Sequence, residues 1–326
     1  YRAQSADGHI ALTSALGIIR LLVTVVLFAV ALILILSNLG VNVTGLIAGL
    51  GAVFELREGA SAESMLRKAP VAMIATLDAS SAAGSASRAE ALGRLRTLLR
   101  DSREFTLARA RYDAGSMREL SASRADLDAM QLVLKGTIPL VVAADRASEI
   151  LNAISIGREF GIRVVISSGA EAWSVAPQLA AAKIPVLTGA MNNIPESFNA
   201  LGQRQENLAL LRAAGVQVAI VGNGAGGEDN FNVRNLRYEA GNAVAYGMSW
   251  DDALRAITLT PAEILGVSDK VGSLSIGKSA NLVIWSGDPF EYATIPERVF
   301  VAGKDTRIMT RQDQLTARYR TLPVKY

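Results

Sequence analysis

Residues 138–190 read IPLVVAADRASEILNAISIGREFGIRVVISSGAEAWSVAPQLAAAKIPVLTGA, and this stretch decides the fold. Short β-branched and apolar runs alternate in it with longer segments of helical periodicity. Continuous apolar runs are typical of strands that are covered on both faces. Regular alternation of strand and helix predicts a parallel sheet joined by crossover helices, so we expect an α/β fold.

The alternation continues to about Gly247. The expected strands are Ile138–Val142, Arg163–Ser167, Ile184–Leu187 and Val216–Val221. The expected helices are Ala147–Phe160, Glu171–Ala182, Ser197–Ala214 and Asn235–Tyr246. Because a closed barrel of this type needs eight strands, we expect a partial TIM-type (β/α) barrel with open sheet edges. It is either a fragment or completed by another chain.

Four segments are expected from the composition along the chain. They are a transmembrane, channel-like helical segment (1–54), a mostly helical connecting region (55–136), the partial barrel (137–272), and a small β-domain remnant with a C-terminal tail (273–326). Within the connecting region, Pro70–Leu77 reads as a short strand. Arg88–Phe105 carries leucines at helical spacing opposite arginines, which predicts an amphipathic helix with a solvated basic face.

The run Leu21–Leu36 is LLVTVVLFAVALILIL, and no charged residue occurs between Arg20 and Glu55. About 20 apolar residues suffice to cross a bilayer. We therefore predict a transmembrane helix and a membrane location, in a bacterial inner membrane or facing the periplasm. A buried core helix is the alternative. A signal peptide fits less well, since its apolar core is only about 7–15 residues long.

Residues 18–52, IIRLLVTVVLFAVALILILSNLGVNVTGLIAGLGA, are rich in small residues in their second half. Over about residues 16–53 the sequence resembles the small-conductance mechanosensitive channel family. The resemblance implies a spanning helix, then a glycine- and alanine-rich pore helix, and assembly as a homo-oligomer. The pattern stops at Phe54, so a junction between two unrelated proteins near residues 52–60 is an alternative explanation.

Histidine and cysteine usage restricts the chemistry. His9 is the single histidine and there is no cysteine, so nucleophiles activated by imidazole are excluded from the rest of the chain. Zinc sites usually use imidazole ligands, so a metal site here would have to consist of oxygen atoms. The 33 basic and 30 acidic residues are interspersed, which argues against nucleic acid as a partner.

Three stretches carry a second resemblance: PLVVAADRASEI, GIRVVISSGAEAWSVAPQLAAAKIPVL, and the segment from NVRNLRYEAGNAV to NLVIWSGDPF. Over about residues 60–310 the chain resembles the amidohydrolase superfamily, in particular its imidazolonepropionase-like and prolidase-like branch. The most specific part is T-x-x-P-A-x-x-L-G-V with the following G-S-L-x-x-G-K and S-G-D-P-F. The resemblance implies a barrel that leads into a small β-domain, hydrolysis of non-peptide carbon–nitrogen bonds in a small molecule, and zinc or another divalent metal as cofactor.

The ligand positions of that family do not carry ligands in this sequence. The resemblance places the fifth-strand histidine at Ala143 or Ala144, the sixth-strand histidine at Ser168 and the eighth-strand aspartate at Asn223. Alanine has no lone pair, serine is a weak neutral ligand, and an amide is not a general base. We therefore predict no bound metal and a catalytically degenerate hydrolase.

A few carboxylates remain as oxygen donors near these positions. Asp145 and Glu171 are the weak catalytic candidates, and Glu228 and Asp229 are further oxygen ligands. We prefer to interpret each as an acid at a helix N-terminus, where the helix dipole favours negative charge.

Residues 222–227 match G-x-G-x-x-G, the pattern of a dinucleotide-binding loop. Glu228 and Asp229 follow at once and would repel a phosphate. We therefore interpret residues 222–227 as a flexible rim loop and expect no cofactor. The alternative function is a membrane-anchored, non-catalytic binding or assembly domain, or a channel-related membrane protein.

Overall fold

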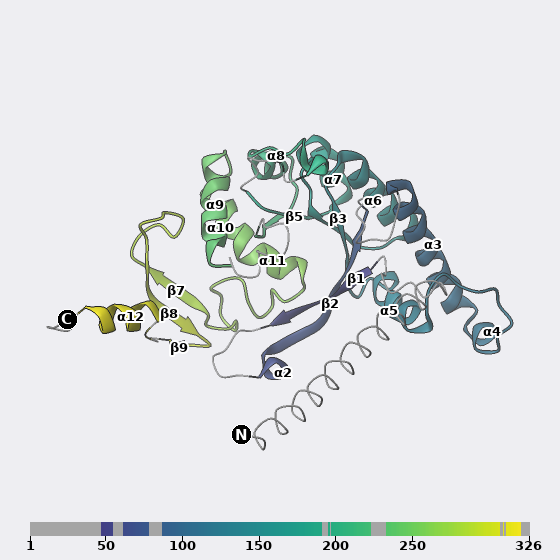
Figure 1. Cartoon of the computed structure of the whole chain (residues 1–326), viewed down its shortest axis with the longest axis horizontal. Helices are drawn as coiled ribbons and strands as arrows, with labels where there is room; N and C mark the ends of the chain where they lie inside the picture. The colour runs from purple at the N-terminus through teal and green to yellow at the C-terminus, as the bar shows by residue number, and fades with distance from the viewer. Residues whose placement is uncertain are drawn as a thin grey trace, which may run out of the picture. The chain divides into compact units, whose positions relative to one another are not determined.

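A six-stranded sheet in the order β1-β2-β3-β4-β5-β6 organises the chain (Figure 1). The computed structural model describes residues 47–54, 61–77, 87–190, 195, 197–222, 233–306, 309 and 311–320. The parallel strands are β2 (Leu66–Thr76), β3 (Leu140–Ala144), β4 (Val164–Ser168), β5 (Val186–Thr188) and β6 (Val218–Ile220). Because the spatial order follows the chain and β1 and β6 form opposite edges, the sheet is a half-barrel, as predicted.

The predicted strands and two of the four predicted helices are confirmed, with small differences at their ends. Helix α6 (Ala147–Phe160) and α9 (Leu236–Ala245) are continuous. The segment predicted as one helix from Glu171 divides into η2 (Ala172–Val175) and α7 (Ala176–Ala182), and the next divides into η3 (Phe198–Ala200) and α8 (Asn207–Ala213). Pro177 lies in the first turn of α7, where its missing N–H has no helical partner to lose.

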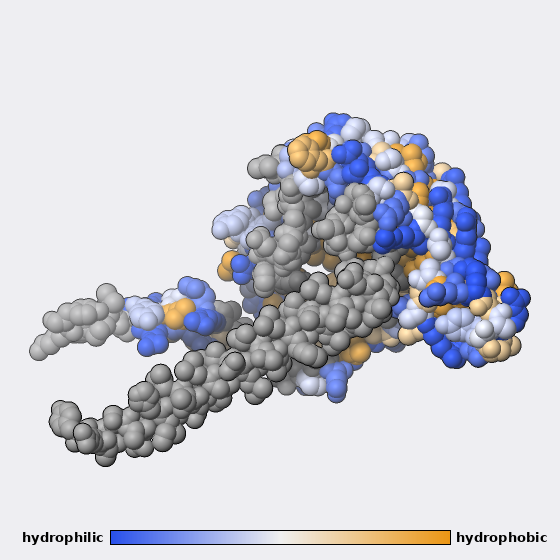
Figure 2. All heavy atoms as spheres, turned by 45° about the vertical axis from the view of Figure 1, so that its right-hand side comes forward, coloured by the Kyte–Doolittle hydropathy of each residue, from blue (hydrophilic) through white to orange (hydrophobic). Residues whose placement is uncertain are grey.

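The main hydrophobic core lies between one face of the sheet and the helices. Alternate strand residues such as Leu140, Val142 and Ile166 are fully buried there against α3 (Arg88–Leu107), α5 (Arg124–Leu134) and α6. Leu95 and Leu99 of α3 are fully buried as well, as the predicted amphipathic helix requires. The opposite side of α3 is solvated, and the surface around α3, α4 (Arg109–Asp113) and α5 is mostly hydrophilic (Figure 2).

The other face of the sheet carries a smaller apolar cluster. Ala72, Val141, Val165 and Ala219 from four strands pack there with Ile264 of α11 (Leu259–Ile264). The strands are therefore covered on both faces. This explains why their sequences are continuously apolar instead of alternating.

Strand β1 (Ile47–Phe54) corrects the prediction of a pore helix that extends to residue 53. It pairs antiparallel with β2, for example Leu50 with Met73 and Gly51 with Ala72. Each glycine costs about 1 kcal/mol in a helix interior, which disfavours a helix in this glycine-rich stretch. Residues from both of the segments proposed as 1–54 and 55–136 thus enter the sheet.

The predicted transmembrane run Leu21–Leu36 lies outside the described residues. Among the residues that are described, no helix is long and apolar enough to span a membrane.

A three-stranded antiparallel sheet follows the half-barrel in the chain. It consists of β7 (Leu282–Trp285), β8 (Pro296–Val301) and β9 (Lys304–Asp305), and α12 (Arg311–Tyr319) follows it. The Arg237 guanidinium of α9 donates to the carbonyls of Pro289 and Thr294, both at 3.0 Å. The Trp250 indole of α10 (Trp250–Ile257) donates to the Asp288 carboxylate. The remaining described elements are α2 (Ala62–Met65) and η5 (Val233–Asn235).

Asp101 of α3 is a buried carboxylate that ties the helical region together. It accepts hydrogen bonds from the Arg118 guanidinium and, at 2.7 Å, from the Ser121 N–H. Burial raises the pKa of Asp101, but the hydrogen bonds from Arg118 and Ser121 outweigh it and hold the pKa below its ordinary value. The stabilisation is therefore present above the pKa of the unfolded chain, about 3.9, and is lost as the pH falls through the folded pKa.

We expect Asp101→Asn to lower the free energy of unfolding by about 1–3 kcal/mol at pH 7, because a charged acceptor is lost. The difference from wild type should shrink below about pH 4. Urea titrations at several pH values measure the difference in free energy of unfolding. The control is Asp113→Asn, because Asp113 forms a more exposed ion pair with Arg109. A difference that is independent of pH would contradict the assignment.

Candidate functional site

The candidate site lies at the carboxyl ends of the parallel strands, where folds of this kind keep their functional groups. Strand register places Ala143 opposite Ser167 and Ala144 opposite Ser168. The predicted ligand positions on β3 and β4 are thus neighbours at one edge of the sheet. The third position, Asn223, and the candidates Glu228 and Asp229 lie outside the described residues.

Ser168 and Asp145 are brought together at this edge. The Ser168 hydroxyl donates to Asp145 Oδ1, and the Ala170 N–H donates to the same oxygen at 3.2 Å. Ser168 has a φ of 74°, which is uncommon for a residue with a side chain, and Gly169 follows with a φ of 65°. A Cβ at Gly169 would come within 3.2 Å of Ala172 and Val186, so the turn requires glycine there.

Glu149 is a residue of this site that the sequence analysis did not single out. It is 2% exposed, and its Oε2 accepts from the backbone N–H of Asp145 at 3.0 Å and of Arg146 at 3.1 Å. Its Oε1 accepts from the Arg88 guanidinium. The available signal was its spacing, since a glutamate three residues after the N-cap Arg146 is part of a capping box.

Two other glutamates bind the backbone of strand-end loops in the same way. Glu171 accepts from the Ala147 N–H at 2.9 Å, and Glu239, only 3% exposed, accepts from the Ala190 N–H at 2.7 Å. Glu171 is the N-cap residue of η2, as expected for an acid at a helix N-terminus, and its carboxylate also binds the first turn of α6, which precedes it in the chain. Its catalytic assignment and that of Asp145 stay predictions.

Asn207 of α8 is a second residue that the sequence analysis missed. It is fully buried, accepts from the Trp173 N–H at 2.9 Å, and donates through Nδ2 to the Gly169 carbonyl at 3.1 Å. It links α8 to the loop that follows β4. An asparagine inside a helical pattern gives no sequence signal of this role.

The donors at the described part of the edge do not fit a divalent metal. Ala143 and Ala144 offer no ligand atom, and the Ser168 hydroxyl donates its proton to Asp145. The carboxylates of Glu149, Glu171 and Glu239 accept hydrogen bonds from the backbone. Among the described residues, no three His, Cys, Asp or Glu side chains are grouped so that they could hold a metal ion.

We expect Glu149→Ala to lower the free energy of unfolding by about 1–3 kcal/mol, because two backbone N–H groups and Arg88 lose their shared acceptor. Urea denaturation measures this change. Glu159→Ala, which removes exposed ion pairs with Arg96 and Arg100, is the matched control and should cost at most about 1 kcal/mol. If both variants lowered the free energy of unfolding equally, the result would argue against a stabilising role of the Glu149 hydrogen bonds.

Comparisons with known proteins agree with the fold. Residues 141–310 match the model of the amidohydrolase family. A crystal structure of an amidohydrolase from Thermotoga maritima MSB8 is similar with a TM-score of 0.69 and 27% sequence identity, over 80% of this chain and 68% of that one.

Two curated relatives match parts of the chain. Imidazolonepropionase of Acidiphilium cryptum (strain JF-5) is 29% identical over 124 residues, which are 37% of this chain and 29% of that protein. The urease subunit alpha of Yersinia pestis (strain Pestoides F) is 34% identical over 119 residues, 35% of this chain and 18% of that protein. The matched segments thus span less than a third of either relative.

The matches give no support to the expected mechanosensitive-channel relationship of residues 16–53. They do agree with the half-barrel and its small β-domain, since the family match runs through both. More than half of the chain lies within that match, and the chain belongs to the amidohydrolase family.

Proposed function

We propose that this chain is an amidohydrolase-family hydrolase by descent, of the imidazolonepropionase-like branch, that has lost metal-dependent hydrolysis of carbon–nitrogen bonds. The observation that carries the proposal is the side chains at the ends of β3 and β4. The positions where the family resemblance expects histidines carry Ala143 or Ala144 and Ser168, and the carboxylates beside them are used as backbone acceptors.

The chemistry of the remaining groups supports this proposal. Hydrolysis at a metal centre needs a bound water whose pKa is lowered by the cation. Without the metal, Ser168 would have to act as the nucleophile, and activation of serine usually requires a base such as imidazole. The only group to which the Ser168 hydroxyl donates in the described structure is the Asp145 carboxylate, which is a much weaker base. The pair orders the turn after β4 without activating the hydroxyl.

We expect the purified full chain to contain far less than one zinc or manganese ion per molecule after incubation with either metal. Elemental analysis by mass spectrometry measures this content. The chain should also fail to hydrolyse imidazolonepropionate and a panel of cyclic amides above the rate of a Ser168→Ala control. Stoichiometric metal that is lost in Asp145→Asn would contradict the proposal.

We also propose that Leu21–Leu36 anchors the chain in a membrane. The support is the stretch of residues 21–46, which precedes β1, carries no charge and is longer than the roughly 20 residues needed for a span. This proposal concerns attachment only and is independent of catalysis.

We expect the full chain to float with phosphatidylcholine vesicles in a density gradient. Phe28→Arg combined with Ile33→Arg should reduce flotation strongly, since each arginine at the centre of a span costs about 2.5–3.5 kcal/mol. Leu274→Arg, at a side chain that is already 80% exposed, is the control. Flotation that the double variant leaves unchanged would refute anchoring by this segment.

A further inference from the structure

A pocket of about 420 Å³ lies between α9, the first residue of α10 and the loop that connects β7 to β8. Its volume is within the range of small-molecule sites, roughly 300–1,000 Å³. Gly241 of α9 allows the loop to come this close, because a Cβ at Gly241 would lie only 3.0 Å from the Phe290 carbonyl oxygen. The pocket is therefore formed where the helices of the half-barrel meet the connection between two strands of the second sheet.

Four aromatic side chains line this pocket and form two pairs. The ring centroids of Tyr238 and Tyr292 are 5.6 Å apart, and those of Trp250 and Phe290 are 5.2 Å apart. Part of this aromatic surface is open, since Tyr292 is 84% exposed and Trp250 is 38% exposed. A ligand in the pocket can therefore contact aromatic rings without displacing a buried side chain.

Two carboxylates complete the lining, to which no described lysine or arginine contributes. Asp288 accepts from the Trp250 indole N–H at 3.0 Å and from the Phe290 N–H at 2.9 Å, but both donors are neutral. The Glu291 carboxylate forms no hydrogen bond or ion pair with any residue that the structure describes. Neither negative charge is thus neutralised within the described part of the chain. We refer to the four rings together with Asp288 and Glu291 as the aromatic pocket.

Arg237 is a cation beside the aromatic pocket, and its donors are already engaged. One of its nitrogens donates to three backbone carbonyls of the loop between β7 and β8. Its guanidinium also lies 4.3 Å from the centroid of the Tyr238 ring, so this aromatic cluster already attracts one cation of the protein itself. Because Arg237 carries a single positive charge against two carboxylates, the region keeps a net negative charge.

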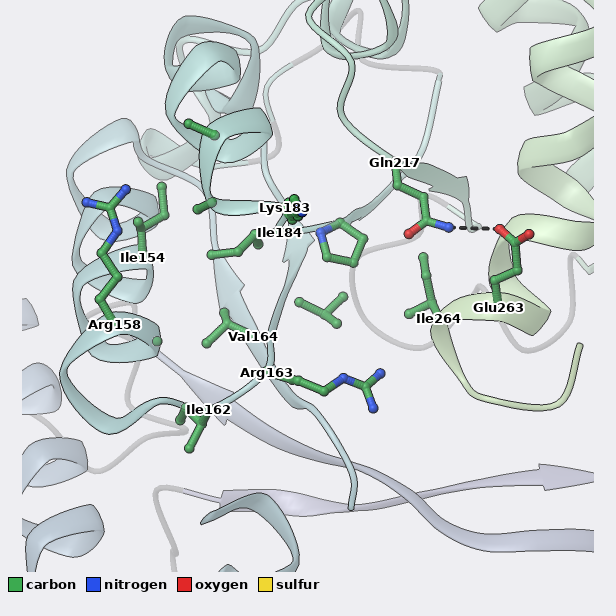
Figure 3. A pocket seen from close by; sticks show the side chains of 15 residues that line it. Ile154, Arg158, Ile162, Arg163, Val164, Lys183, Ile184, Gln217, Glu263 and Ile264 are labelled. Carbon is green, nitrogen blue, oxygen red and sulfur yellow. Dashed lines mark hydrogen bonds between the residues drawn. The ribbon is translucent and has the colours of Figure 1, made fainter. Parts of the chain in front are cut away.

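The hollow at the amino ends of β4, β5 and β6 offers no comparable surface (Figure 3). Its aliphatic side chains, such as Val164 and Ile184, are at most 8% exposed. The charged ends of Arg158 and Arg163 point to opposite sides of it in Figure 3. The aromatic pocket differs in both respects, since its rings are open and its two carboxylates belong to one short loop.

We propose that the aromatic pocket binds a small organic cation that carries an alkylated ammonium group. The negative faces of aromatic rings attract such a group, and its alkyl substituents make apolar contact with the same rings. The carboxylates of Asp288 and Glu291 add Coulomb attraction and disfavour anions. The groups that line this pocket are separate from those of the candidate site, so the inference does not depend on whether the chain hydrolyses anything.

The test is calorimetric titration of the full chain with choline and with 3,3-dimethylbutan-1-ol, which has the same shape but a carbon atom in place of the charged nitrogen. We expect choline to bind at least about tenfold more tightly, because the neutral alcohol gains only the apolar contact. The methyl proton signal of choline should also move upfield on binding, since ring currents shield groups that lie over an aromatic face.

Tyr292→Leu should weaken choline binding about threefold to tenfold, because an aliphatic side chain keeps the apolar contact but loses the attraction between cation and ring. Glu291→Gln should weaken choline binding by a similar factor, because it removes the unpaired charge. Both side chains are exposed, so the thermal unfolding midpoint should stay that of wild type.

Tyr319→Leu and Glu297→Gln are the matched controls, because they change an exposed tyrosine and an exposed glutamate outside the pocket. Their affinities for choline should equal that of wild type. Absence of binding at millimolar choline would overturn the proposal. Equal affinities for choline and the neutral alcohol, or unchanged choline affinities in both pocket variants, would overturn it as well.

Discussion

Buried backbone N–H groups at the carboxyl edge of this half-barrel need hydrogen-bond acceptors, and this need determines which side chains lie there. A parallel strand that ends in a tight loop leaves N–H groups beyond the ladder, and each costs free energy if it is buried without a partner. Glu149, Glu171 and Glu239 supply these acceptors for three loops. Their charges are stabilised by backbone dipoles and, for Glu149, by Arg88, so the acids belong to the scaffold of the edge.

The same constraint explains how side chains of this chain hold the described loops at the carboxyl edge. A metal site would fix the strand ends through coordination, whereas here hydrogen bonds to side chains fix the described loops. The Ser168–Asp145 contact and the buried Asn207 hold the turn after β4, which passes through two successive residues with positive φ. The proposed loss of metal ligands would therefore leave the described loops of this edge in place.

The sequence predicted those parts of the fold that depend on local pattern. Helix α6 has the predicted bounds, because its periodicity ends at Gly161, which is free to adopt the left-handed C-cap conformation. The end of the channel-like stretch was predicted wrongly. Its small apolar residues suit either a packed helix or a strand, and the partner that decides for the strand, β2, is recognised only in three dimensions. Asn207 was missed because burial, which sets its role, leaves no local pattern, and the capping-box spacing of Glu149 does not reveal its burial or its contact with Arg88.

The two ends of the sheet differ in how many side-chain hydrogen-bonding groups remain free to bind a ligand. At the carboxyl end the named carboxylates already accept protein hydrogen bonds, so a ligand there would compete with the contacts that hold the loops. At the amino end the side chains of Arg158, Arg163 and Lys183 form no hydrogen bond or ion pair with any residue that the structure describes. A ligand at that end would displace only water, which costs far less than breaking buried hydrogen bonds. Recognition away from the carboxyl end is therefore compatible with the stability of the fold.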